Sequence, residues 1–278
     1  MKREQALRRR MRALHTLSDA VSAMKSLSAH HFLLSRKALP PARAYRAGVD
    51  EAIQQIGLAQ PASRSASAGI VLVSSDLGLC ADYNARLVAH AIAEHDRLHG
   101  ELFYCVGRRS RAALERAGIP ISRSYRASSS VTGLTGLLLQ IAEDLLEDYT
   151  AGRVGSLFAI AARFDGAGRF TPVSTQVLPI ERTGTTHLVR PSPYGNPSHL
   201  AAAAVREFLY ITLYEILLDA LAAEHGMRLV AAEAAEHWLD DTSEATRRQL
   251  RAIRSEAATQ EVLDIAAGAR RRIVSQER

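Results

Sequence analysis

The C-terminal stretch from Glu224 to Arg278 constrains the fold of this chain more than any other part. It contains no proline, only two glycines interrupt it, and its dominant residues are the strong helix formers Ala, Leu, Glu, Arg and Gln. As one helix it would be about 80 Å long, at about 1.5 Å per residue. Because that is longer than a compact domain needs, we expect this helix to lie against a second long segment.

Residues 1–57 offer the matching helix. Apolar or small residues recur along it, and from Leu14 onward they follow steps of three and four residues, which is the spacing of a coiled-coil seam. We expect Pro40 and Pro41 to kink or pause this helix, and Gly57 to end it. The predicted seam residues are Leu7, Leu14, Leu17, Val21, Met24 and Ser28.

The middle of the chain has a different character. We interpret residues 58–68 as a linker and residues 69–197 as an α/β insert domain, in which strands and helices alternate as in a doubly wound sandwich. The expected strands cover residues 69–75, 101–107, 119–125, 155–164 and 172–179, the last two as a hairpin around 165–169. The expected helices cover residues 82–98, 108–117 and 134–149, and residues 183–197 are expected to be a loop.

Residues 198–278 are predicted to form the C-terminal helix that pairs with residues 1–57. Ser198 is a plausible N-cap for a helix that starts at His199. The segment Phe208–Ala222 is apolar nearly all round, so we expect it to pack against both the insert and the N-terminal helix. Beyond Leu229 small alanines replace the large apolar residues, which is typical of a slim shaft rather than a globule.

The chain is basic, with a net charge of +6 and a pI of about 9.6. This balance favours an acidic partner, which could be nucleic acid, a membrane surface or an acidic protein, although an Arg-rich composition would explain it equally well. A basic coiled coil that binds nucleic acid or an acidic protein is therefore an alternative function. Against nucleic acid, the basic runs carry no interleaved aromatic residues, and Trp238 stands alone. No apolar run is long enough for a transmembrane helix, and the N-terminus is too charged for a secretory signal, so we expect the whole chain to be the mature protein.

Catalytic and metal motifs are weak or missing. The first expected strand leads into DLGLCADYN, which lacks the glycines of a phosphate loop. His30 and His31 are adjacent on a helix and point about 100° apart, so they are poor metal co-ligands. Cys80 and Cys105 have no CxxC spacing and are expected to be buried thiols. For Ser74–Asp76 a turn held by Asp76 is favoured over a nucleophile site, because no GxSxG surrounds it. An enzyme with helical arms is thus the weakest hypothesis.

Three segments resemble signatures of the gamma subunit of the rotary F-type ATP synthase. The opening helix, LRRRMRALHTLSDAVSAMKSLSAHHF, is similar to that family's Arg-rich start and A-M-K core. SSDLGLCADYN resembles S-S-D-[RK]-G-L-C-G-x-[FY]-N, with Ser75, Asp76, Gly78, Leu79, Cys80 and Asn84 in matching places. EHGMRLVAAEAA and ATQEVLDIAAGA resemble the family's closing helix. Since the three occur in the correct order over nearly the whole chain, the resemblance is specific.

The resemblance implies a fold and a function. The fold would be a long antiparallel coiled coil of the terminal helices with an inserted Rossmann-like, doubly wound α/β domain. The chain would be the central rotor shaft, a non-catalytic subunit that transmits torque between the membrane c-ring and the catalytic alpha–beta ring, with no cofactor and no metal. The implied partners are the alpha, beta, epsilon and delta subunits and the c-ring, with one copy per complex and no nucleic acid. The implied location is the cytoplasmic side of a bacterial inner membrane, as a peripheral subunit.

The resemblance also implies which residues meet partners. Met24 and Lys25 match the A-M-K motif near a beta-subunit contact, and their expected role is part of a polar catch. The C-terminal helix would supply the rest of that catch through Arg228, Thr259, Gln260 and Glu261. The exposed basic face expected to meet acidic loops consists of Arg8, Arg9, Arg10 and Arg12.

Some positions depart from the family pattern. Ala81 and Asp82 stand where the signature usually has Gly and a small residue, so the turn is expected to differ. Ser255 replaces a frequent Gln near the catch, and a basic run follows Gly268, where the family usually ends. These departures suggest a divergent subgroup.

Overall fold

The computed structural model describes residues 2–56, 67–166, 168–180 and 197–276. Contacts divide the chain into two compact units. One joins Met1–Ser26 with Ala232–Arg278 and is called here the coil unit; the other, Leu27–Ala231, is called the insert unit. Two long helices, α1 (Lys2–Ile56) and α5 (Pro197–Gln276), contribute to both units, so each unit contains a segment from both ends of the chain.

The insert unit is built on a five-stranded sheet with the strand order β3-β2-β1-β4-β5. The strands are β1 (Ala68–Val73), β2 (Gly100–Val106), β3 (Arg123–Tyr125), β4 (Ser156–Gly166) and β5 (Arg169–Leu178). The first four are parallel, and β5 pairs antiparallel with β4, which confirms the predicted hairpin. Every residue of β1 is buried, as expected for a central parallel strand covered on both faces.

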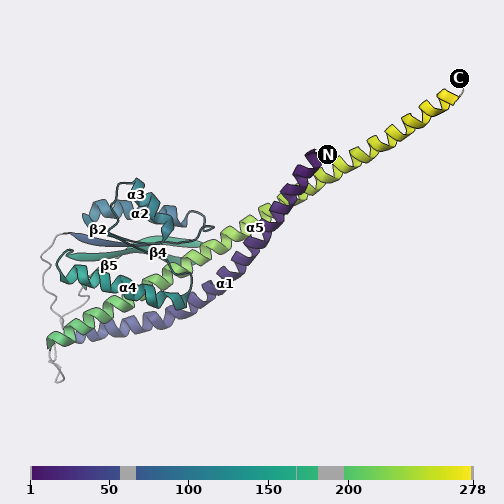
Figure 1. Cartoon of the computed structure of the whole chain (residues 1–278). Coiled ribbons are helices and arrows are strands. Elements are labelled where there is room, and N and C mark those ends of the chain that lie inside the picture. Colours follow the sequence, from purple (N-terminus) through teal and green to yellow (C-terminus); the bar gives the residue numbers. More distant parts are fainter. Residues whose placement is uncertain (1, 57–66, 167, 181–196, 277–278) are drawn as a thin grey trace. The chain divides into compact units, whose positions relative to one another are not determined.

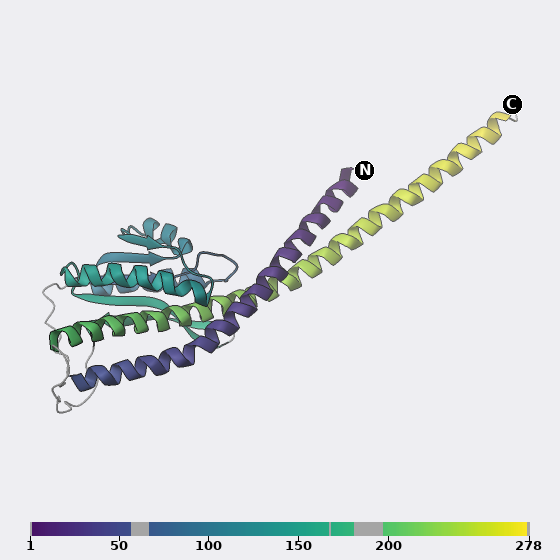
Figure 2. The same ribbon diagram turned by 60° about the horizontal axis from the view of Figure 1, so that its bottom comes forward.

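Helices cover both faces of this sheet (Figure 1). On one face, α2 (Tyr83–Leu98) and α3 (Arg108–Arg116) pack against alternate strand residues such as Ile70 and Leu72. On the other face, α4 (Val131–Thr150) and the insert-unit part of α5 pack against Val71 and Val73. Figure 2 shows α4 and this part of α5 running along the same side of the sheet. The doubly wound α/β fold is therefore confirmed.

The apolar segment of α5 is the centre of the second layer. Leu209, Leu213, Leu217 and Leu221 are buried in one cluster with α4, the sheet and Leu39 of α1. Polar contacts tie α5 to the same helix: Arg43 pairs with Glu215 and Asp219 at 3.1 and 3.3 Å, and the Tyr45 hydroxyl donates to Glu207 at 2.8 Å. The prediction that this segment touches both the insert and the N-terminal helix is confirmed.

The coil unit is an antiparallel helix pair. Glu4 of α1 accepts a hydrogen bond from Arg254 of α5 at 3.1 Å, while Ser22 and Lys25 donate to Glu236 at 2.8 and 2.7 Å. Later residues of α1 thus pair with earlier residues of α5, as in an antiparallel pair. Leu14 and Leu239 are buried between the helices. The predicted antiparallel pairing of the two ends of the chain is confirmed.

The predicted seam is wrong at one position. Leu17 is 52% exposed and lies off the seam, while the half-buried Ser18 takes its place. The half-buried and buried positions Leu7, Met11, Leu14, Ser18 and Val21 keep alternating steps of four and three residues. A small residue at this step lets the two helices approach closely, and the larger leucine remains on the outside.

Element boundaries differ from the sequence predictions in several places. α1 continues through Pro40 and Pro41, which are both exposed, instead of pausing there. The third strand is reduced to β3, and α4 begins earlier because the Ser130 hydroxyl caps it by accepting from Gly133 N–H at 3.3 Å. α5 begins at Pro197, so Ser198 lies inside the helix rather than at its N-cap. Gly57, most of the expected linker and nearly all of the expected loop 183–197 lie outside the described residues, and the domain boundaries stay a prediction.

Candidate functional site

The signature loop, residues 74–84, joins β1 to α2 at the carboxyl edge of the sheet. Asn84 closes it from the first turn of α2: its amide oxygen accepts from Ser75 N–H at 3.1 Å, and its amide nitrogen donates to Ser75 Oγ at 2.8 Å. The Ser75 hydroxyl donates onward to the Leu77 carbonyl at 2.8 Å, and Cys80 Sγ accepts from Asn84 at 3.3 Å. The signature residues therefore bond to one another and build the loop, which leaves them little capacity for a ligand.

Asp76 ties this loop to two neighbouring loops. One carboxylate oxygen accepts from the backbone N–H groups of Arg108 and Ala127 at 2.9 and 3.2 Å, and the other lies 3.3 and 3.7 Å from the guanidinium groups of Arg108 and Arg126. Arg108 begins α3, and Ala127 precedes α4. The expected turn held by Asp76 is confirmed, and one side chain fixes the carboxyl ends of β1, β2 and β3 to each other.

Two residues of the loop have backbone conformations that are unusual for residues with a side chain. Leu79 has φ of 58° and Ala81 has φ of 49°, both in the left-handed region that glycine adopts at little cost. The expected difference between this turn and that of the family stays a prediction. In this chain Ala81 has a conformation that suits glycine better than alanine. Next to them, a Cβ at Gly78 would lie 2.8 Å from a guanidinium nitrogen of Arg109, so the flexible end of that side chain would have to move.

Arg228, a residue of α5, binds the signature loop and so anchors it to that helix. Only 1% of this residue is exposed. Its Nε donates to the Gly78 carbonyl at 3.2 Å, and another guanidinium nitrogen pairs with the Glu224 carboxylate one helical turn away. Burial raises the pKa of Glu224, and the neighbouring Arg228 opposes that shift. The pair gives the loop a charge-assisted support inside the protein.

Two histidines extend this buried network. His225 donates from Nε2 to the Ser129 carbonyl at 3.0 Å and accepts at Nδ1 from Arg228 at 3.2 Å, so α5 also holds the loop before α4. The ring of His31 on α1 packs on the ring of His225 with centroids 5.2 Å apart. His30 is exposed, as expected for a helical surface residue, whereas His31 is half-buried.

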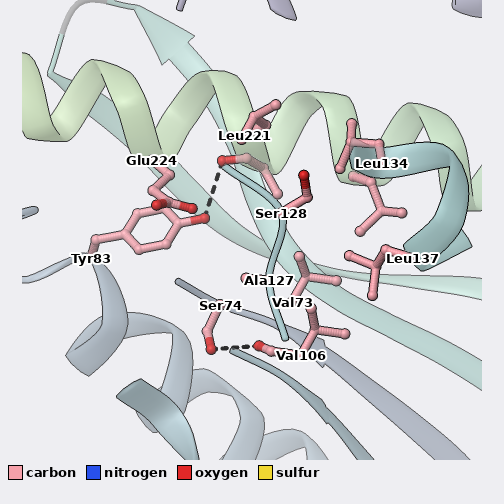
Figure 3. Close-up of a pocket in the computed structure, with 12 residues that line it drawn as sticks. Val73, Ser74, Tyr83, Val106, Ala127, Ser128, Leu134, Leu137, Leu221 and Glu224 are labelled. Carbon is pink, nitrogen blue, oxygen red and sulfur yellow. Dashed lines mark hydrogen bonds between the residues drawn. The ribbon is translucent and has the colours of Figure 1, made fainter. Parts of the chain in front are cut away.

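A small cavity remains at the carboxyl ends of β1 and β2, where α/β domains commonly bind ligands. Figure 3 shows it between the sheet and α5, with Tyr83 and Glu224 near one side and Leu134 and Leu137 near the other. The Tyr83 hydroxyl donates to the Ala220 carbonyl at 3.2 Å. The cavity volume is about 10 Å³, room for about one water molecule. The place where a nucleotide would lie is filled by the side chains of α5.

Catalytic chemistry finds no support in the described residues. Both cysteines are free and buried, as predicted, and burial raises the pKa of Cys80 and raises that of Cys105 to about 12, which keeps both as thiols. Among the residues that the structure describes, no three His, Cys, Asp or Glu side chains come together to hold a metal ion.

The expected catch residues fall into separate places. Met24 and Lys25 lie half-buried on α1 in the coil unit, where the Lys25 ammonium pairs with Glu236 at 2.7 Å and with Glu233 at 3.9 Å. The hydrogen bond to Glu236 raises the pKa of Lys25. Arg228 lies buried in the insert unit with partners from its own chain, so a contact between Arg228 and a second subunit stays a prediction that its surroundings do not favour.

The remaining catch residues are exposed in the C-terminal third of α5. The Thr259 hydroxyl donates to the Ser255 carbonyl at 2.9 Å, Gln260 donates to Asp264 at 3.0 Å, and Glu261 is exposed. The neighbouring apolar residues Val262 and Ile265 are exposed as well. This segment therefore exposes polar and apolar side chains together, and its role as a partner contact stays a prediction.

The basic face is also exposed. Arg8 pairs with Glu4 at 2.7 Å, whereas Arg9, Arg10 and Arg12 have no ion-pair partner in the described part of the chain. Arg10 lines a shallow groove of the coil unit together with Trp238, which is 60% exposed. The positive charge near the start of α1 is thus free to meet an acidic surface.

Sequence reasoning missed three members of the buried network: Glu224, His225 and His31. The available signal was the spacing of Glu224 and Arg228, which places both on one side of a helix next to an apolar segment. That spacing normally indicates an exposed ion pair, and only the packing of the loops onto α5 shows that this one is buried.

Comparisons with known proteins agree with this architecture. A family profile described as ATP synthase matches residues 3–270. The ATP synthase gamma chain of Moorella thermoacetica is 28% identical over 280 residues, covering 95% of this chain and 96% of the relative. That of Pelotomaculum thermopropionicum is 26% identical over 277 residues, with 95% and 96% covered.

Solved structures show the same fold. A chain of the Euglena gracilis mitochondrial ATP synthase, from a structure of OSCP, F1 and c-ring, aligns with a TM-score of 0.67 and 12% identity, over 96% of this chain and 93% of that one. A chain of the Tetrahymena thermophila mitochondrial ATP synthase, from a structure of the central stalk and c-ring, aligns with a TM-score of 0.57 and 17% identity, over 78% and 99%.

The strained loop gives a first testable prediction. Ala81→Gly should raise the free energy of unfolding by about 1 kcal/mol, because glycine adopts the observed φ without the clash of a Cβ. Ala89→Gly, at an exposed position inside α2, should lower it by about 1 kcal/mol. Urea unfolding of the full chain measures both. A loss of stability in both variants would show that Ala81 is not strained.

The buried ion pair gives a second prediction. Arg228→Met should lower the free energy of unfolding by about 3–5 kcal/mol, because it leaves the Glu224 carboxylate buried without its cation. Glu224→Gln combined with Arg228→Met should recover part of that loss, since no charge then remains to be desolvated. Urea titrations at pH 8 compare the two variants, and an equal loss in both would contradict the role of the pair.

Proposed function

Because this chain belongs to the ATP synthase gamma-chain family, as a non-catalytic subunit of the central rotor stalk, we propose that it transmits torque between the membrane c-ring and the catalytic alpha–beta ring. The main support is the continuity of α5, which forms part of the core of the insert unit and continues as a helix of the coil unit. A turning force applied to the insert is thereby carried along an unbroken hydrogen-bonded helix rather than across a linker.

The coil unit is the part that we assign to the catalytic ring. Its two helices are joined by a narrow seam and by ion pairs such as Lys25 with Glu236, and its outer surface exposes the basic face of α1. Acidic loops on the ring subunits would complement Arg9, Arg10 and Arg12, and such complementarity tunes register more than affinity. Met24, Thr259, Gln260 and Glu261 are the proposed catch contacts.

Lys25 takes a more limited role in this proposal. Its ammonium is already bonded within the chain, so a partner carboxylate would have to share it with Glu236. Arg228 acts from inside the insert unit by supporting the signature loop. Charge-assisted hydrogen bonds between the catch residues and a ring subunit would form in only some rotary positions. They would stabilise those positions without stopping rotation.

The assembly that we propose contains one copy of this chain with alpha, beta, epsilon and delta subunits and the c-ring. The insert unit would meet the c-ring and epsilon, and the complex would lie at the cytoplasmic side of a bacterial inner membrane. The bacterial relatives of similar length support this placement. In the part of the chain that the structure describes, no helix is long and apolar enough to cross a membrane.

Affinity purification tests the proposed assembly. A tagged copy of this chain, expressed in its own cells and isolated under mild conditions, should bring alpha and beta subunits with it. Cells that express the untagged chain serve as the control. Recovery of the tagged chain without either subunit would overturn the proposed function.

The catch assignment gives a further prediction. Met24→Lys should lower the number of ions pumped per ATP hydrolysed by the assembled complex, because it adds a second cation beside Lys25 where the ring contact is proposed. Ala20→Lys, one helical turn earlier and exposed, adds the same charge off the contact and should pump normally. Normal pumping by the Met24 variant would contradict the placement of the catch.

A further inference from the structure

The contact between His31 and His225 joins α1 to α5 in the insert unit. Their rings lie with centroids 5.2 Å apart and planes inclined by 32°, and the ring of His30 lies 5.5 Å from that of His31. His225 is 2% exposed. Two imidazoles from opposite ends of the chain therefore form a direct helix–helix contact next to the Arg228 anchor.

The surroundings of His225 hold its ring neutral. Nε2 donates its hydrogen to the Ser129 carbonyl, so Nδ1 carries the lone pair that accepts from Arg228. A proton added to Nδ1 would remove this bond and place a second cation against the guanidinium. Burial, and then Arg228, lower the pKa of His225 to about 4.

One ring nitrogen of the half-buried His31 is also poorly placed to hold a proton. Its Nδ1 is buried and has no hydrogen-bond partner among the described residues. Burial, followed by the charges of His30 and Arg228, lowers its pKa. A proton on Nδ1 of His31 would leave a buried N–H group without an acceptor. It would also place a positive charge next to the His225 ring, which already bonds the Arg228 guanidinium.

We propose that the stacked rings of His31 and His225 are an acid-sensitive latch between α1 and α5. With both rings neutral the helices pack together, and a proton on either ring separates them through repulsion and the loss of the bond between Arg228 and His225. This inference rests on the geometry of the insert unit and does not depend on the proposed torque function.

The direction of the pH dependence follows from linkage. The pKa of His31 is lowered in the folded state and that of His225 is lowered to about 4, so the stabilisation is complete above about pH 6.5 and is lost as the pH falls below that value. Of the other groups around the pair, Glu224 has a raised pKa, so its protonation would favour the folded state as the pH falls and cannot cause the loss. Cys80 and Tyr83, which face Glu224, are buried, and burial raises the pKa of each, so both stay neutral as the pH falls.

Hydrogen exchange of the full chain tests the latch. After correction for intrinsic exchange rates, amide protection in residues 27–35 of α1 and 221–230 of α5 should fall by roughly tenfold or more between pH 7.5 and pH 5.0, since opening releases the neutral rings to protonate in water. Protection in α2, away from the pair, should change less and serves as the internal reference.

Matched variants identify the titrating groups. His31→Phe keeps an aromatic ring without a titratable nitrogen, and it should reduce the acid-induced loss of protection at least threefold. His31→Phe with His225→Gln, where Gln keeps an N–H donor, should abolish the loss. His237→Phe, at an exposed position of α5, should behave as the unaltered chain does. An unaltered response in His31→Phe, or an equal loss of protection in α2, would overturn the latch.

Discussion

The burial of the apolar segment of α5 is the constraint on which the rest of the structure depends. Leu209, Leu213, Leu217 and Leu218 are all buried, and burying one such side chain is worth about 1.5–3 kcal/mol. Because the segment is apolar on several sides, it needs neighbours on several sides, and the sheet, α4 and α1 supply them. The insert therefore has no complete core without the helix, and the helix cannot leave the insert without exposing much of that core.

The same packing explains why the cavity at the carboxyl ends of β1 and β2, within the described part of the chain, has room for only about one water molecule. The carboxyl ends of β1 and β2 are closed by α5, and the polar side chains gathered there bond to backbone groups of neighbouring loops. Asp76 and Arg228 would look like members of an active site in another protein. Here each fixes a loop, and the buried charges maintain the geometry of the loops instead of acting on a substrate.

Much of this architecture could be predicted from the sequence, because it follows from periodicity. The two long helices, the alternation of strands and helices, the β4–β5 hairpin and the buried thiols all come from local patterns. The errors arise where packing overrides the pattern. Leu17 fits the seam by spacing but is excluded from it, and Pro40 and Pro41 are tolerated because they lie on the exposed side of α1. The buried network around Arg228 joins residues far apart in the chain, which no local pattern reveals. The catch residues depend on other subunits and stay predictions.

The pairing of Glu4 with Arg254 places nearly the whole length of the chain between two side chains that touch. On the ribosome, α1 is made first and its partner last. At about 5–20 residues per second, α1 waits roughly 10–50 s for that partner, with its seam open to water. Joining α1 to α5 also closes a very long loop of chain. The conformational entropy of that loop is lost before the contacts between the helices can compensate for it. The helix pair is thus a product of the finished chain, and the exposed seam of α1 is the surface that a chaperone would have to protect until synthesis ends.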